Sequence, residues 1–445
     1  MKILFVSLGC DKNLVDSEEM LGILRQNGYE MTDDETEADI IVVNTCCFIN
    51  DAKEESINTI IEMGRYRLEE KIKALIVTGC LAQRYKEEIL QEIPEVDAVL
   101  GTGSYGNIIE AVNAVLAGSK YTSFEGIDEL PDTGAERIVT TGGSYEYLKI
   151  AEGCEKNCTY CIIPQIRGKY RSVPMERLIA TAESFAKQGV KELILVAQET
   201  TLYGVDLYGK KMLHELLKAL AKIQGIVWIR LQYCYPEEIY PELIETIKTE
   251  KKVCHYIDLP IQHCSDCILK RMNRRTTRAD LERIISNLRQ EIPDIVLRTT
   301  LITGFPGETE EDHEELMQFV EDMRFDRLGV FTYSPEEGTP AASMPGQVEE
   351  EVKKSRQADI MELQQDISLE KGDEHIGREL LTFIEGKVAD ENAYVGRTYA
   401  DAPGVDGYIF VNTGISLMTG DFVNVHVTGA LEYDLIGEVA DEFTE

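Results

Sequence analysis

Short apolar runs alternate with amphipathic stretches over residues 1–120. The runs at 3–6, 40–44, 74–78 and 98–100 predict strands, and the stretches at 16–27, 52–67, 83–91 and 106–117 predict helices. Strands that alternate with helices form a parallel sheet covered by helices. The first part of the chain is therefore predicted to be a Rossmann-like parallel α/β domain.

A second series of strands and helices follows a linker at residues 125–143, which Pro131, Gly134 and a Gly-Gly pair mark as irregular. Its predicted strands lie at 147–151, 193–197, 227–232, 256–259, 296–302 and 326–332. Five or six strand–helix units in about 230 residues fit a partial (β/α) TIM-like barrel better than a small open sheet. A helix at 349–372 closes this part.

The periodicity changes again near residue 376. Short alternating runs at 379–385, 393–400, 408–411, 422–428 and 435–439 are separated by Gly and Asp turns, which predicts a small five-stranded β-barrel. We therefore expect an α/β protein of three domains, at residues 1–130, 140–374 and 376–445.

Composition restricts where the chain works and what it contacts. No apolar run approaches the roughly 20 residues that a membrane helix needs. Eleven cysteines in a chain without an export signal are better explained as metal ligands, redox groups or buried small residues than as disulfides. A cytoplasmic protein without membrane contact is expected. The net charge of −35 repels nucleic acid and attracts basic partners.

The thiols at Cys154, Cys158 and Cys161 form a Cys-x3-Cys-x2-Cys loop directly after a predicted strand. Thiolates suit iron, and three on one tight loop can hold three irons of a 4Fe-4S cluster while the fourth iron stays open. A structural zinc site would need a fourth thiolate or imidazole close by, and no His lies near in the sequence. The spacing predicts an iron–sulfur cluster.

This spacing, with Tyr160 before the third thiol, resembles the radical S-adenosylmethionine superfamily. The resemblance implies that the open iron chelates S-adenosylmethionine, whose reductive cleavage releases a 5′-deoxyadenosyl radical. Gln198 and Glu199, at the end of a strand, can supply acceptors for the ammonium group. Ile302 and Gly304 lie in a segment similar to the strand that packs against adenine and ribose. These residues, with Tyr160, are predicted to bind the cofactor.

A second set of thiols follows the strands of the N-terminal domain. Cys10, Cys46 and Cys80 each come directly after a different predicted strand. Because parallel strands end at one edge of a sheet, the three thiols can converge there. A lone free Cys is often only a packing residue, but three at equivalent places predict a second metal site.

With two such sites, the chain resembles the radical S-adenosylmethionine methylthiotransferases from end to end, including a C-terminal segment like the TRAM barrel. The run Gly-Cys10-Asp-Lys-Asn-Leu-Val-Asp-Ser-Glu most resembles the enzymes that modify ribosomal protein S twelve, whereas the tRNA enzymes usually carry Gly-Cys-Gln-x-Asn. The resemblance implies a second 4Fe-4S cluster on Cys10, Cys46 and Cys80. That cluster would present the sulfur that is methylated and transferred, and an external low-potential donor would supply electrons. The radical chemistry would be enclosed between two domains and the barrel.

Two substrate classes compete. Residues 376–445 contain three Lys or Arg against 13 Asp or Glu, a balance of −10, which suits a basic ribosomal protein better than RNA. The resemblance then implies β-methylthiolation of an aspartate on that small-subunit protein. A tRNA methylthiotransferase is the alternative. A non-catalytic iron–sulfur or zinc protein is a second alternative, but it would need neither open iron sites nor strands for S-adenosylmethionine.

Three weaker patterns have simpler interpretations. The glycines at 101, 103 and 106 match a dinucleotide fingerprint but come too late in the domain. Cys264 and Cys267 have Cys-x2-Cys spacing without a second pair and are interpreted as incidental. The basic run at residues 270–278 is typical of a solvated helix face, although no other segment offers a candidate patch for an anionic ligand.

Overall fold

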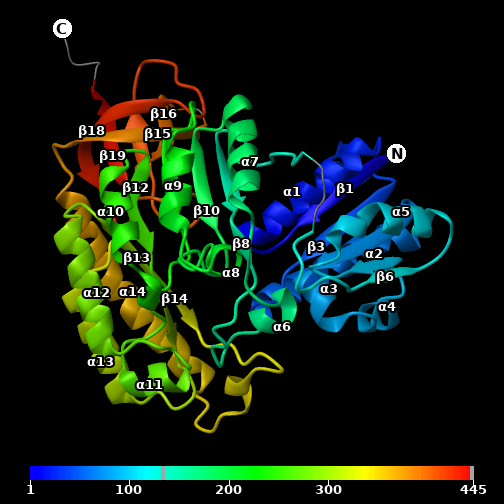
Figure 1. Cartoon of the computed structure of the whole chain (residues 1–445), viewed down its shortest axis with the longest axis horizontal. Helices are drawn as coiled ribbons and strands as arrows, with labels where there is room; N and C mark the ends of the chain where they lie inside the picture. The colour runs from blue at the N-terminus through cyan, green and yellow to red at the C-terminus, as the bar shows by residue number, and fades with distance from the viewer. Residues whose placement is uncertain (132–135, 390, 441–445) are drawn as a thin grey trace.

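The structure is a computed structural model of the whole chain, and residues 1–131, 136–389 and 391–440 are described. A parallel α/β sheet, a second parallel sheet and a closed β-barrel follow one another along the chain (Figure 1). The predicted fold is confirmed. Residues 132–135 of the predicted linker lie outside the described residues. No helix of the described part is long and apolar enough to cross a membrane.

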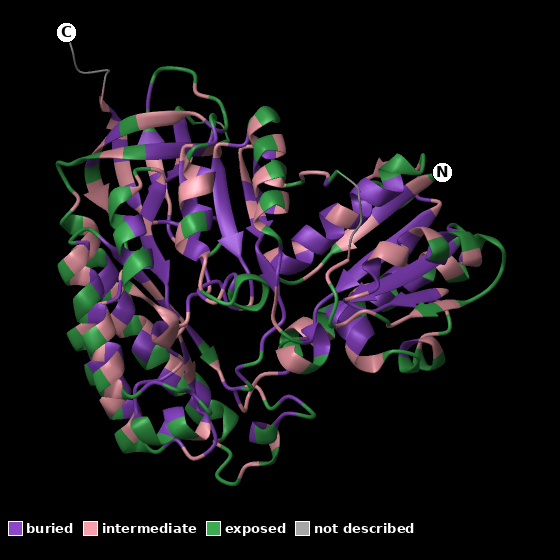
Figure 2. Ribbon diagram, in the orientation of Figure 1, coloured by how far each residue is buried: buried purple, intermediate pink, exposed green. Residues whose placement is uncertain are grey.

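The N-terminal sheet has six parallel strands in the order β2-β1-β3-β4-β5-β6. Its strands are β1 Lys2–Ser7, β2 Glu30–Thr32, β3 Ile40–Thr45, β4 Ala74–Gly79, β5 Ala98–Leu100 and β6 Tyr121–Ser123. All residues of β3 and β4 are buried, as central strands covered on both faces must be (Figure 2).

Helices cover both faces of this sheet. α1 (Asp11–Gln26) and α5 (Ile108–Leu116), the latter preceded by the short η1 (Tyr105–Asn107), pack their apolar side chains on one face. α2 (Asn50–Leu68), α3 (Cys80–Tyr85) and α4 (Glu88–Glu92) pack on the other. Ile162 and Ile166, which belong to the segment after the Cys-x3-Cys-x2-Cys loop, join this second core. The thiol loop is thereby packed against the N-terminal sheet.

The central sheet also has six parallel strands, in the order β14-β13-β12-β11-β10-β7. They are β7 Tyr145–Lys149, β10 Glu192–Val196, β11 Trp228–Leu231, β12 Val253–Asp258, β13 Val296–Thr303 and β14 Arg327–Thr332. Consecutive strands are neighbours, so the sheet is an open, partial barrel rather than a doubly wound sheet. Only the short antiparallel pair β8 (Ala151–Glu152) and β9 (Arg171–Ser172) interrupts the series.

The helices of this part lie outside the sheet, and buried residues on all of them except α8 (Val205–Tyr208) join those on the strands in one continuous apolar core. They are α7 Met175–Lys187, α8 Val205–Tyr208, α9 Leu213–Ala221, α10 Pro241–Thr249, α11 Asp266–Arg271, α12 Arg278–Glu291, α13 Glu310–Met323 and α14 Glu350–Asp373, with 3-10 turns η2 Pro236–Glu238 and η3 Pro340–Ser343. α12 and α13 each begin with a capping box, from Thr277 to Asp280 and from Thr309 to Asp312.

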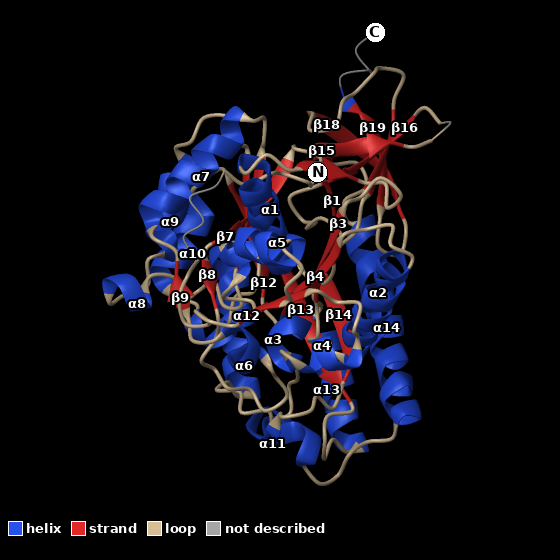
Figure 3. Cartoon of the chain, turned by 90° about the vertical axis from the view of Figure 1, so that its right-hand side faces the viewer, coloured by secondary structure: helices blue, strands red, loops and turns tan. Residues whose placement is uncertain are grey.

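The C-terminal barrel is closed in the order β15-β16-β17-β19-β18. Its strands are β15 Glu379–Lys387, β16 Ala393–Arg397, β17 Ile409–Asn412, β18 Phe422–Ala430 and β19 Leu435–Val439, and they gather at one end of the molecule (Figure 3). Phe383 and Phe422 pack against Trp228, the first residue of β11. The barrel therefore covers the amino ends of the central strands, and the expectation that it helps to enclose the site at their carboxyl ends is wrong.

Three local predictions also differ from the structure. α1 begins at Asp11 rather than Asp16, so that Cys10 itself is the residue before the helix. The helix predicted at 83–91 is two helices, because Lys86 between them has a positive φ of 47°. β2 and β6 were not predicted, since each is a three-residue edge strand without an apolar run.

Candidate functional site at the junction of the two sheets

The Cys-x3-Cys-x2-Cys loop connects β8 to α6 (Ile163–Arg167). Its start is fixed by the amide of Cys154, which donates to the carbonyl of Gly168 over 3.1 Å. Its middle is fixed by Thr159, whose amide and hydroxyl donate to the carbonyls of Met272 and Arg271. Gly153 has a φ of +80°, and a Cβ there would lie 2.1 Å from the carbonyl oxygen of Lys169. Only glycine permits this close approach.

Two thiols of this loop, Cys154 and Cys158, are buried, and Cys161 is partly buried. Burial, with a smaller contribution from the neighbouring Cys158 thiol, raises the pKa of Cys154 to about 11. Burial also raises the pKa of Cys161, with a further contribution from Cys158. Without a metal Cys154 and Cys161 hold their protons, whereas iron binds thiols as thiolates.

The donor set fits an iron–sulfur cluster. No three Cys, His, Asp or Glu side chains of the described ranges are placed to hold one metal ion. In a 4Fe-4S cluster each thiolate binds a different iron, so the ligands need not converge on one point. Three soft donors on one loop meet that requirement.

Arg274 lies beside the first set of thiols, and the sequence did not single it out. Its Nη1 is 3.9 Å from Sγ of Cys158, its Nη2 donates to the carbonyl of Pro260, and its guanidinium stacks 4.4 Å from the ring centroid of Tyr235. Arg271 donates to the carbonyl of Pro306. The interpretation of residues 270–278 as a solvated helix face is therefore wrong for both arginines. The signal that could have found Arg274 was its place in the only basic run of an acidic chain.

Glu199 follows β10 and carries a carboxylate suited to a cation. Its Oε1 accepts hydrogen bonds from the amide and hydroxyl of Thr201, while its buried Oε2 has no hydrogen-bond partner. Burial raises the pKa of Glu199 to about 8. A buried carboxylate oxygen without a partner is costly unless a ligand satisfies it.

The side chain of Gln198, the neighbour of Glu199, already has hydrogen-bond partners within the protein. Its Nε2 donates to Oε1 of Glu152 over 2.6 Å, and its Oε1 accepts from the amide of Gly153 over 2.8 Å. It therefore holds the start of the thiol loop. The two adjacent residues that the sequence grouped together differ in the structure, since Glu199 alone has an unsatisfied oxygen.

Tyr160, Ile302 and Gly304 were predicted to bind the cofactor. Tyr160 and Ile302 pack against the same buried apolar cluster, which contains Phe305 and Tyr333. The rings of Tyr160 and Phe305 meet edge to face with centroids 6.4 Å apart. Gly304 has a φ of +70°, and a Cβ there would lie 2.2 Å from Cγ of Lys353. The structure thus brings Tyr160 and Ile302 to one cluster, while Gly304, two residues after Ile302, packs against Lys353.

The second set of thiols lies where three neighbouring strands end. Cys10, Cys46 and Cys80 follow β1, β3 and β4, which are adjacent in the sheet. Gly9 has a φ of +90°, and a Cβ there would lie 2.6 Å from Cβ of Cys46. Burial raises the pKa of Cys46 and of Cys80, with a further contribution to each from the Cys10 thiol.

Asn13 explains part of the motif around Cys10. Its Nδ2 donates to the carbonyls of Leu8 and Thr45 over 2.9 and 2.8 Å. These two carbonyls lie just after β1 and at the end of β3, so the side chain ties the two strand ends together. Its Oδ1 lies 3.7 Å from Sγ of Cys80.

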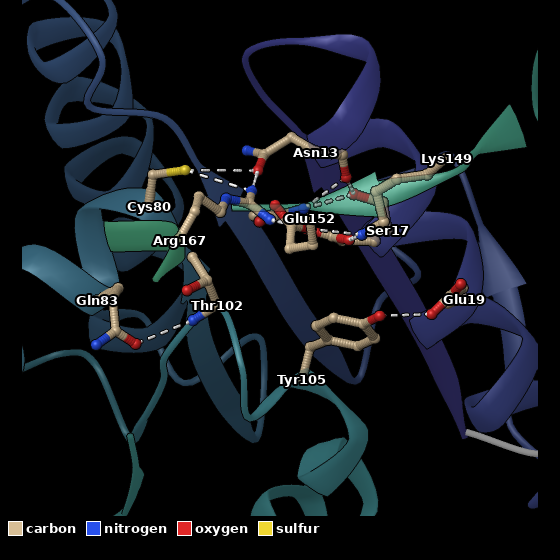
Figure 4. Close-up of polar contacts among 12 residues, drawn as sticks. Asn13, Ser17, Glu19, Cys80, Gln83, Thr102, Tyr105, Lys149, Glu152 and Arg167 are labelled. Carbon is tan, nitrogen blue, oxygen red and sulfur yellow. Dashed lines mark hydrogen bonds and ion pairs between the residues drawn. The ribbon is translucent and has the colours of Figure 1, made fainter. Parts of the chain in front are cut away.

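Buried ion pairs join the two sheets at this point (Figure 4). Arg167 pairs with Asp16 and Glu152 over 2.6 and 3.2 Å, and Lys149 pairs with the same two carboxylates. Although burial opposes it, Lys149 and Arg167 lower the pKa of Glu152. Asp16 belongs to α1 and the other three residues belong to the central part, so the N-terminal sheet is fixed beside the thiol loop.

Two further contacts close the junction. Arg84 pairs with Glu336 over 2.8 Å and also donates to the carbonyl of Glu337. Nζ of Lys12 lies 3.4 Å from the ring centroid of Tyr233. These contacts add two more links between the N-terminal and central parts; beside them, Cys46 and Cys80 are buried and Cys10 is exposed.

Comparisons with known proteins agree with this arrangement. The family models for the uncharacterized protein family UPF0004, the radical SAM superfamily and the TRAM domain match residues 2–101, 148–320 and 376–440. The "Ribosomal protein uS12 methylthiotransferase RimO" of Lachnoclostridium phytofermentans is 64% identical over 98% of this chain and 99% of its own length. The chain belongs to the RimO family. The family's protein from Pelotomaculum thermopropionicum is 52% identical over 98% of this chain and 99% of its own length.

Membership of this family confirms the predicted radical S-adenosylmethionine methylthiotransferase, and the radical SAM match implies S-adenosylmethionine and a 4Fe-4S cluster. Among solved structures, the radical S-adenosylmethionine methyltransferase TsrM from Kitasatospora setae has a TM-score of 0.56 at 14% identity, covering 87% of this chain and 81% of its own. That likeness shows the fold.

The weaker sequence patterns have structural roles. Gly103 packs against the linker, where a Cβ would lie 2.5 Å from the carbonyl oxygen of Gly126, and Thr102 donates to the carbonyl of Ile166. The glycine-rich segment is thus a packing surface. Cys264 is buried and Cys267 is exposed.

Proposed function

We propose that this chain transfers a methylthio group to the β-carbon of an aspartate in the small-subunit ribosomal protein uS12. The observation that carries the proposal is the presence of two three-thiol sets in parts of the chain that buried ion pairs join, in a chain that belongs to the RimO family. S-adenosylmethionine and two 4Fe-4S clusters would supply a 5′-deoxyadenosyl radical, a methyl group and the transferred sulfur.

Cys154, Cys158 and Cys161 would hold the first cluster. The unpartnered Oε2 of Glu199 would accept the ammonium group of S-adenosylmethionine, because an ionised carboxylate is the group that this buried cation requires. Tyr160, Ile302 and Gly304 would lie along its adenosine. Gln198 would act indirectly by holding Gly153 and hence the loop.

Cys10, Cys46 and Cys80 would hold the second cluster. The glycines before Cys10 and Cys80 have φ values of +90° and +93°, which lets the three strand ends approach one another. The ion pairs of Asp16, Lys149, Glu152 and Arg167 would keep this set facing the first. Contacts such as Arg84–Glu336 would exclude water from the radical.

The acidic barrel, with its balance of −10, would bind the basic ribosomal protein. Since it packs at the amino ends of the central strands, it would do so away from the thiols. We also propose domains at 1–130, 140–374 and 376–445, a cytoplasmic location and an external low-potential electron donor.

The test is mass spectrometry of uS12 and of tRNA from a strain lacking this gene. We expect uS12 to lack an adduct of about 46 Da, roughly the mass of a methylthio group that replaces hydrogen. The full-length protein should restore the adduct, and Cys158→Ala should neither restore it nor form 5′-deoxyadenosine. Cys267→Ala is the matched control, because this thiol is exposed and outside both sets. Loss of the adduct from tRNA alone would show the alternative substrate.

A further inference from the structure

Arg167 reaches from the central part of the chain to a thiol of the N-terminal part. It is the last residue of α6, six positions after Cys161, and its side chain is buried. Its Nη2 lies 3.4 Å from Sγ of Cys80 and also donates to Oδ1 of Asn13 (Figure 4). Each of the two contacts joins residues more than 80 positions apart.

The other end of the guanidinium is held by carboxylates. Nη1 lies 2.6 Å from Oδ2 of Asp16 and 3.2 Å from Oε2 of Glu152. Because a guanidinium is planar and stays charged, these contacts fix both the direction of Nη2 and a positive charge beside Cys80.

The same contacts continue to the first thiol set. Glu152 accepts from Gln198, and Gln198 accepts from the amide of Gly153, the residue before Cys154. A continuous series of hydrogen bonds therefore runs from Cys80 to the start of the Cys-x3-Cys-x2-Cys loop. Arg167 contributes the link that contacts sulfur.

We infer that Arg167 raises the reduction potential of the cluster held by Cys10, Cys46 and Cys80, through a hydrogen bond and a positive charge at Cys80. Hydrogen bonds to sulfur and local charge are among the factors that set such potentials. A donor at a thiolate stabilises the more negative, reduced state, so the potential rises. This inference rests on the proposed second cluster, and Arg167 is a positioning and tuning residue rather than an iron ligand.

Replacing Arg167 by lysine would distinguish the effect of the hydrogen bond on the reduction potential from the effect of the charge. Lys149 shows how an ammonium group behaves here, since it pairs with Asp16 and Glu152. A second ammonium group would pair with these carboxylates, but it has no second nitrogen, such as Nη2 of Arg167, that could also reach Cys80. Arg167→Lys therefore keeps the charge and loses the contact with sulfur, and Arg167→Gln loses both.

The experiment measures the midpoint potential by redox titration followed by electron paramagnetic resonance. It uses the full chain with Cys154, Cys158 and Cys161 replaced by Ala, so that only the second cluster contributes, and reconstitution should give about four irons per chain. We expect a more negative potential in Arg167→Lys and a larger negative shift in Arg167→Gln. Arg177→Gln is the control, because it removes the same charge from a guanidinium that approaches the carbonyl oxygen of Pro131.

Each outcome decides whether Arg167 raises the potential of the second cluster. An unchanged potential in Arg167→Lys with its iron retained would overturn the inference and leave the proposed function intact. If Arg167→Gln loses its cluster, Arg167→Lys decides alone. Loss of the cluster from both variants, with Arg177→Gln retaining it, would assign Arg167 a purely structural role. If the chain with Cys154, Cys158 and Cys161 replaced by Ala binds no iron–sulfur cluster, both the proposed second cluster and this inference are overturned.

Discussion

Arg397 in the C-terminal barrel donates a hydrogen bond over 2.7 Å to the carboxylate of Glu192, the first residue of β10. Both side chains are fully buried. Arg230 donates to the other oxygen of the same carboxylate over 2.8 Å. The barrel is thus fixed to the amino ends of the central strands by a charge pair that water does not reach.

Removing one member of this pair should destabilise the protein strongly. Arg397→Met leaves Glu192 with one cationic partner, and breaking a buried pair in this way costs about 3–5 kcal/mol. We expect the free energy of unfolding in urea to fall by about that amount. Arg283→Met is the control, since its pair with Asp280 lies on the surface and should contribute less than about 1 kcal/mol. Equal losses in the two variants would contradict the prediction.

Glu199→Gln should weaken binding of S-adenosylmethionine. A hydrogen bond to a charged group contributes about 1.5–3 kcal/mol, so affinity should fall by about tenfold or more. Isothermal titration calorimetry of the anaerobically reconstituted protein measures this directly. Glu155→Gln, an exposed change on the thiol loop, should leave the affinity unchanged. Iron content should be equal in both variants, and wild-type affinity in Glu199→Gln would remove this carboxylate from the site.

Gly79→Ala should disrupt the second thiol set. Gly79 has a φ of +93°, and a Cβ would lie 2.2 Å from Oδ1 of Asn44 and 2.6 Å from the carbonyl oxygen of Thr45. We expect iron after reconstitution to fall from about eight to about four per chain. Gly28→Ala is the matched control. Gly28 has a φ of +82°, and a Cβ there would have no atom within 4 Å, so the substitution adds backbone strain without a clash. Full iron content in Gly79→Ala would contradict the expected clash.

His263 should make the protein less stable in mild acid. Burial lowers the pKa of His263 to about 3, below its usual value near 6.5. The unfolded chain therefore binds a proton that the folded chain does not, and stability falls as the pH drops from about 6.5 towards 3. Between pH 7 and pH 5 this contributes up to about 2 kcal/mol. Urea unfolding at both pH values should show a smaller loss of stability for His263→Gln than for wild type, and an equal loss in the two proteins would contradict the prediction.

Much of the architecture follows from local pattern. The four apolar residues that begin each of β3 and β4 predict buried strands whatever surrounds them, and the bounds of both strands agree with the prediction to within one residue. Edge strands such as β2 carry no such run and were missed. The helix at 83–91 was predicted whole because its break depends on the backbone of Lys86, which no periodicity encodes.

The chain's spacing of cysteines determined by itself that three thiols share one loop and that three others follow neighbouring strands, since both are consequences of short-range sequence and parallel pairing. Tertiary structure alone decided that Arg274 approaches Cys158, that Arg167 approaches Cys80, and that the barrel covers the amino rather than the carboxyl ends of the central strands. Those contacts join residues 87 to 205 positions apart. They depend on which partners buried charges find once the sheets pack, and although the basic run marks Arg274 as unusual, no local pattern specifies the partner of any of these arginines.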